Sequence, residues 1–93
     1  MKDVVIVDSV PTGLAKSFRG RFNPTRSDDM AAHLINALLD RNAALDPKEV
    51  DDVIVGAANQ AGEQSFNLAR MAAILSRLPV ETTGVTVNRF CAS

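Results

Sequence analysis

Three short apolar runs are spaced along the chain, at Val4–Val7, at Val53–Ala58 and in a segment that Gly84 opens. Successive positions in these runs are apolar, with many β-branched residues, where a half-buried strand would alternate apolar and polar residues. This pattern is typical of strands buried on both faces of a parallel sheet. The chain therefore predicts three buried strands.

Between the second and third runs, and before the second, apolar residues return every three or four positions, which is the period of an amphipathic helix. Ser27 can cap a helix from about Asp28 to Arg41, whose apolar stripe consists of Met30, Leu34, Ile35 and Leu38. Asn67 is a plausible cap for a second helix that Pro79 stops, and its apolar face is predicted at Leu68, Met71, Ala72, Leu75 and Leu78. The segment Asp46-Pro47-Lys48-Glu49 predicts a single helical turn, since a capping side chain precedes a proline at the first helical position.

The order strand, helix, strand, helix, strand predicts an α/β fold with right-handed βαβ crossovers and a mainly parallel sheet. We expect residues 1–93 to belong to a single domain. The connection Ser9–Arg26 contains two prolines and two glycines without a steady period, and predicts a long irregular loop.

Composition excludes several classes of function. The hydrophobic content is 46% and the charged content 23%, which is ordinary for a globular protein. A formal net charge of -1 and an aromatic content of 4% give no electrostatic footprint or stacking platform for nucleic acid. No apolar stretch reaches the ~20 residues that span a bilayer, and one cysteine permits no internal disulfide. We expect a cytoplasmic protein with no membrane or nucleic-acid partner.

Cys91 follows the third predicted strand and is the leading candidate for a covalent nucleophile. Reactive groups in open α/β sheets gather beyond the carboxyl ends of strands, and a cysteine at a strand-to-helix junction is biased toward its thiolate. The alternative is a buried and inert cysteine, because free cysteine is among the most buried residue types. Position alone leaves both interpretations open.

The residues around Cys91 carry a resemblance. Thr86-Val-Asn-Arg-Phe-Cys-Ala-Ser93 resembles the nucleophile segment of the thiolases, and upstream segments match in order and spacing; these are Val4–Asp8, Lys16–Gly20, Asp28–Leu34, Val53–Gly56 and Gln64–Arg70. The whole chain is similar to the amino-terminal part of an acetyl-CoA acetyltransferase or 3-ketoacyl-CoA thiolase. One departure is Pro11, where thiolases commonly carry an arginine, and it affects the anchoring of the local loop.

The resemblance implies a βαβαβ portion of a thiolase-like layered fold with a mainly parallel mixed sheet, and an acyl-transfer function. In thiolases the cysteine corresponding to Cys91 takes an acyl group from a coenzyme A thioester, and histidines and a second cysteine in the carboxyl-terminal half supply acid and base. The resemblance thus implies a remaining carboxyl-terminal part as partner, a homodimer or homotetramer, coenzyme A as substrate, and no metal or other cofactor. The 93 residues alone are expected to be inactive.

Other residues have simpler interpretations. His33, the only histidine, lies in the first predicted helix, far from Cys91 in sequence and without metal-ligand spacing, so a catalytic role is disfavoured. The basic residues of the long loop are predicted to form a solvated surface with local ion pairs, although coenzyme A phosphates or an acidic partner are alternatives; they are Lys16, Arg19, Arg21 and Arg26. Asn67 and Arg70 are most simply structural. By the resemblance, Phe66 and the Val85–Asn88 edge pack across a twofold axis.

Two rival functions stay open. A ketoacyl synthase of the same superfamily also uses a cysteine after a strand, but generates its carbanion by decarboxylation. A noncatalytic interaction module would leave Cys91 as a core residue.

Overall fold

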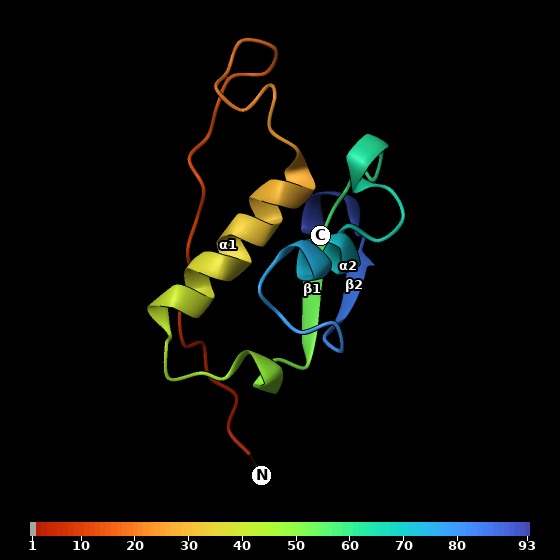
Figure 1. Ribbon diagram of the computed structural model, residues 1–93. Coiled ribbons are helices and arrows are strands. Elements are labelled where there is room, and N and C mark those ends of the chain that lie inside the picture. Colours follow the sequence, from red (N-terminus) through yellow and green to blue (C-terminus); the bar gives the residue numbers. More distant parts are fainter. Residues whose placement is uncertain (1) are drawn as a thin grey trace.

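The computed structural model describes residues 2–93 and shows an α/β arrangement in an elongated body of 45 × 26 × 24 Å. Helix α1 (Ser27–Arg41) packs against helix α2 (Leu68–Leu75), and α2 lies on one face of a parallel sheet made of β1 (Asp52–Gly56) and β2 (Thr83–Val87). Figure 1 shows these elements with the N-terminal segment running along the far side of α1. The predicted α/β class and parallel strand order are confirmed for this part of the chain.

The prediction of a first strand at Val4–Val7 is wrong. Val4–Val7 has no strand structure, and the four side chains are 73–97% exposed. The segment is attached to α1 instead, because the Asp8 carboxylate lies 3.0 Å from Arg41 and accepts a hydrogen bond from Asn42 at 3.1 Å. A cavity of about 740 Å³ with an apolar lining that includes Ile6, Leu38 and Val53 separates it from the sheet. An apolar run becomes a strand only where its backbone meets a partner edge.

The first helix begins one residue earlier than predicted, so Ser27 is helical and the N-cap is Arg26, which makes no capping side-chain bond. The predicted turn is confirmed as a 3₁₀ turn at Pro47–Glu49, where the Asp46 side chain accepts from the Lys48 amide at 3.0 Å. The predicted Asn67 cap is also confirmed, with its side chain accepting from the Arg70 amide.

The predicted stripe of α2 is confirmed only in part. Leu68 and Ala72 are buried as predicted, together with Ala69 and Ala73, whereas Met71 and Leu75 are 40% and 46% exposed. Leu78 is also buried, but it lies outside the helix, which ends at Leu75 and not at Pro79 as predicted. Small side chains allow close packing on both sides of the helix. On the sheet side, a Cβ added to Gly84 would stand 2.7 Å from the Arg70 amide nitrogen, so the missing side chain is a condition of this contact.

The strands are not buried on both faces as predicted. Alternate residues face α2 and are partly buried, among them Val53 and Thr86, while Ile54, Val85 and Val87 on the opposite face are 40–68% exposed. Within residues 2–93, only one layer of helix covers the sheet. The register pairs Asp52 with Thr83 and Gly56 with Val87, so both strands end at the same edge.

Candidate functional site

The carboxyl ends of β1 and β2 meet at one edge of the sheet, and the turn that holds Cys91 is attached there. The last ladder contact is a hydrogen bond of 2.9 Å from the Ala57 amide to the Val87 carbonyl. The chain then forms a 3₁₀ turn at Phe90–Ala92, drawn in dark blue in Figure 1. Cys91 is in this turn as an exposed free thiol. The thiol therefore lies just beyond a strand, as predicted, and it is exposed within residues 2–93.

Strand β2 is fixed to α2 by a small polar network. Asn67 Nδ2 donates to the Gly84 carbonyl at 2.8 Å, and Asn67 Oδ1 accepts from the Thr86 hydroxyl at 2.8 Å. Thr86 Oγ1 in turn accepts from the Ala69 amide at 3.0 Å. Arg70 adds a bond from its guanidinium to the Thr82 carbonyl at 2.6 Å. The strand that leads to Cys91 is thereby held along most of its length by the start of one helix.

The turn itself rests on the end of β1. A Cβ added to Gly56 would overlap with the Ser93 carbonyl oxygen, so the two backbones touch where any side chain would intrude. Asn88 Nδ2 donates to the Ala58 carbonyl at 3.3 Å, and the Ser93 hydroxyl accepts from the Arg89 amide. Glycine at position 56 permits this close approach.

Phe90, directly before Cys91, has a left-handed backbone with φ 51°. This region is costly for a bulky residue and is often found where surrounding contacts hold a functional turn in place. The change of direction turns the chain sharply after the strand. It presents Cys91 at the surface of the sheet edge.

A second polar cluster joins the N-terminal end of α1 to the loop before α2. The Arg26 guanidinium contacts both carboxylate oxygens of Asp28, at 3.1 and 2.9 Å, and this bond holds the pKa of Asp28 below its usual range although burial opposes the shift. Asp28 is only 2% exposed. The Ser27 hydroxyl donates to Glu63 at 3.2 Å. The pKa of Glu63 is lowered by hydrogen bonds to its carboxylate from the backbone amide of Glu63 and from the backbone amide of Ser27.

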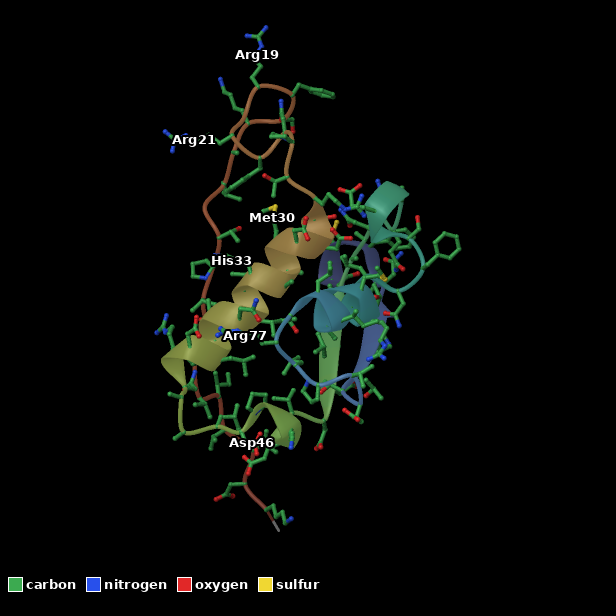
Figure 2. The ribbon with its side chains drawn as sticks, viewed as in Figure 1. Arg19, Arg21, Met30, His33, Asp46 and Arg77 are labelled. Carbon is green, nitrogen blue, oxygen red and sulfur yellow. The ribbon has the colours of Figure 1, made fainter. Side chains whose placement is uncertain are left out.

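The structure does not bring the remaining candidates to Cys91. His33 is exposed on α1, and Figure 2 shows it on the side of the helix that faces the N-terminal segment. Lys16, Arg19 and Arg21 are exposed on the distant loop, where Figure 2 shows Arg19 and Arg21 pointing into solvent. The local ion pair predicted for the loop is found at Arg26 and Asp28.

Two residues of the site were missed as contributors by sequence reasoning, namely Thr86 and Asn88. A signal existed for Asn88, because asparagine directly after a strand commonly folds its side chain onto the backbone two residues on. Thr86 had no distinct signal, since its role depends on neighbours distant in the sequence. Gly56 did have one, because small residues at the end of the apolar run Val53–Ala58 permit a close approach of neighbouring backbone.

Comparison with known proteins gives the same class as the fold and the motif. The model of the thiolase N-terminal domain matches residues 4–93. The chain belongs to the thiolase family.

Curated relatives agree along the full chain. It is 48% identical over 93 residues to the 3-ketoacyl-CoA thiolase of Pectobacterium carotovorum, 49% identical over 92 residues to that of Marinobacter nauticus, and 47% identical over 93 residues to that of Aeromonas salmonicida. Each match covers 99–100% of this chain and 24% of the relative. The chain thus spans about a quarter of the length of the curated relatives it matches.

No helix among residues 2–93 has the length and apolar character to cross a membrane.

Proposed function

We propose that this chain supplies the nucleophile of a thiolase, an acyl-CoA C-acetyltransferase in which Cys91 carries the acyl group. The thiolate of Cys91 attacks the 3-keto carbon of a 3-ketoacyl-CoA, and the bond between carbons 2 and 3 breaks. Acetyl-CoA leaves after its α-carbon takes a proton. The thiol of coenzyme A then attacks the S-acyl-cysteine, which releases the shortened acyl-CoA and restores the cysteine; the reverse direction condenses two acetyl-CoA.

The observation that carries this proposal is an exposed thiol in a tight turn at the edge where two parallel strands end. Such an edge is where α/β folds present reactive groups. The family match and the 3-ketoacyl-CoA thiolase activity for which the relatives are named support acyl transfer as the chemistry. Coenzyme A enters as a substrate, and the reaction proposed requires no metal.

The step also requires groups that residues 2–93 do not bring to Cys91. A base must take the thiol proton, donors must stabilise the oxyanion of the tetrahedral intermediate, and a second acid must protonate the α-carbon. The one histidine, His33, lies on the other side of α1. We propose that these groups come from the carboxyl-terminal three quarters that the relatives possess.

A fusion protein tests the function. Residues 1–93 replace the matching first quarter of the Pectobacterium carotovorum relative, and thiolysis of acetoacetyl-CoA by coenzyme A is measured as acetyl-CoA formed. We expect activity in the fusion protein, an acetyl adduct on the Cys91 peptide by mass spectrometry, and no activity in the 93-residue chain alone. Cys91→Ser is the matched control and should remove the adduct and the turnover.

The rivals predict different outcomes. Loss of carbon dioxide from a malonyl thioester during carbon-carbon bond formation would support a ketoacyl synthase. A folded fusion protein with neither an acyl adduct nor rapid iodoacetamide labelling of Cys91 near neutral pH would support the noncatalytic module and refute the proposal.

The same proposal covers the assembly and its location. Phe66 is 97% exposed with a left-handed backbone, and within residues 2–93 β2 pairs only with β1. A second copy that pairs with the Val85–Asn88 edge would satisfy the unpaired backbone groups of that edge, which favours a homodimer or a homotetramer. The location that we propose for this assembly is the cytoplasm. The mass of the fusion protein in solution tests this assembly, and a monomer contradicts it.

A further inference from the structure

The side chain of Asn88 connects the ends of both strands to the turn that carries Cys91. Its Oδ1 accepts hydrogen bonds from the Phe90 amide at 2.8 Å and from the Ser93 hydroxyl at 3.4 Å. Its Nδ2 donates to the Ala58 carbonyl at 3.3 Å, in the segment that leaves β1. One side-chain amide therefore spans the turn from the residue before Cys91 to the second residue after it.

These bonds act on the strained point of the turn. Phe90 has φ 51°, and a left-handed backbone is held at a bulky residue only when its surroundings determine it. The bond from the Phe90 amide to a side chain two residues earlier is the geometry of an Asx turn. Asn88 is thus the direct side-chain partner of the backbone whose direction sets the position of the thiol.

We propose that Asn88 is a positioning residue for Cys91. It holds Phe90 in its left-handed conformation, and this conformation keeps the thiol at the sheet edge in one orientation. The inference rests on the proposed function, in which Cys91 is the nucleophile. A nucleophile displaced by a fraction of an ångström to one ångström loses much of its reactivity, whereas the binding of a substrate by other groups is little changed.

The experiment uses the fusion protein described above, with two variants of Asn88 and one control. Asn88→Ala removes all three hydrogen bonds and should lower kcat about tenfold to a hundredfold, while KM stays within about twofold of the value of the unchanged fusion protein. Asn88→Asp keeps the acceptor oxygen for the Phe90 amide. At higher pH, the kcat of this variant should come within about threefold of the kcat of the unchanged fusion protein. The reason is that the added carboxylate disfavours a nearby thiolate and shifts the pH-rate profile to higher pH.

Asn59→Ala is the matched control, since Asn59 is an exposed asparagine at the same sheet edge whose side chain makes no hydrogen bond within residues 2–93. It should leave kcat and KM unchanged. Circular dichroism measures the folded fraction, by which each kcat is corrected. If Asn88→Ala only reduces the amount of folded protein, the corrected kcat stays constant. If Asn88 positions Cys91, the corrected kcat falls.

The outcomes separate this inference from the proposed function. If the unchanged fusion protein acylates Cys91 and Asn88→Ala keeps kcat within twofold, the positioning role is overturned and the function stands. If Asn88→Ala does not fold, a kcat of Asn88→Asp that no pH restores overturns the positioning role.

If the unchanged fusion protein forms no acyl adduct, the proposed function fails, and the iodoacetamide labelling rate of Cys91 in the 93-residue chain decides the inference. That chain has one cysteine, so labelling reports on Cys91 alone. A rate changed at least fivefold by Asn88→Ala supports the positioning role. A smaller change overturns it.

Discussion

Replacement of Asn67 tests whether one side chain holds the helix and the strand of the site together. Asn67 has a left-handed backbone with φ 70° and ψ 76°, and its side chain caps α2 and bonds to Gly84 and Thr86 of β2. Asparagine tolerates this conformation better than alanine does. The variant Asn67→Ala therefore removes three hydrogen bonds and adds backbone strain at the same position.

The expected loss of stability follows from these contributions. The cap contributes about 1 kcal/mol, the two bonds to β2 contribute about 1 kcal/mol each, and alanine in the left-handed region costs about 1 kcal/mol more. The sum is about 4 kcal/mol, against a total of about 5–14 kcal/mol at the usual ~0.05–0.15 kcal/mol per residue. Asn67→Gly loses the bonds to β2 without the strain, and its cost is about 2 kcal/mol, since glycine is a fair N-cap.

Urea unfolding of the 93-residue chain, followed by far-ultraviolet circular dichroism, measures these differences. The exposed Asn59→Ala serves as control and should change the free energy of unfolding by less than about 0.5 kcal/mol. Asn67→Ala within 1 kcal/mol of the unchanged chain would refute the network as a source of stability. Equal losses in the alanine and glycine variants would refute the contribution of strain.

Two further predictions concern the close contact at the site and the ion pair of the buried Asp28 with the exposed Arg26. Gly56→Ala places a methyl group on the Ser93 carbonyl and should lower the turnover of the fusion protein at least tenfold. Gly13→Ala is the control, since nothing lies within 4 Å of the added Cβ, and it should not lower the turnover. Equal turnover in the two variants contradicts the importance of the Gly56 contact. Asp28→Asn should destabilise the chain by about 1–3 kcal/mol at pH 7. Because the pKa of Asp28 is lower when folded than its ordinary value of 3.8, this difference should be complete above pH 3.8 and disappear as the pH falls through the folded pKa. A difference that does not depend on pH, measured by urea unfolding from pH 7 to pH 2, assigns it to packing instead.

Local features of the chain were predictable where they depend on neighbours in sequence. The Asp46 cap before Pro47, the Asn67 cap and the helical periods all act within one or two turns, so the pattern alone predicts them. The same is true of Cys91, which follows an apolar run and lies beyond a strand in the structure.

Features that require a partner were not predictable. Val4–Val7 has the composition of a strand, yet it pairs with no strand within residues 2–93, and Asp8 beside it bonds to Arg41 and Asn42 at the end of α1. Ser27 has the chemistry of a cap, yet its hydroxyl donates to Glu63, 36 positions away. A hydrogen bond over such a separation leaves no periodic trace in the sequence.

The sequence by itself determined the class of the fold, the order of most elements, the family and the residue that we propose as nucleophile, because period, capping and motif are local properties. Only the tertiary structure decided which backbone edges pair, which face of the sheet is covered, and how the thiol is held. Gly56, Asn88 and Phe90 illustrate the difference. The sequence predicts a close backbone approach at Gly56, but only the structure identifies Ser93 as its partner and shows Asn88 bonded to a left-handed phenylalanine where the ends of two strands lie together in space.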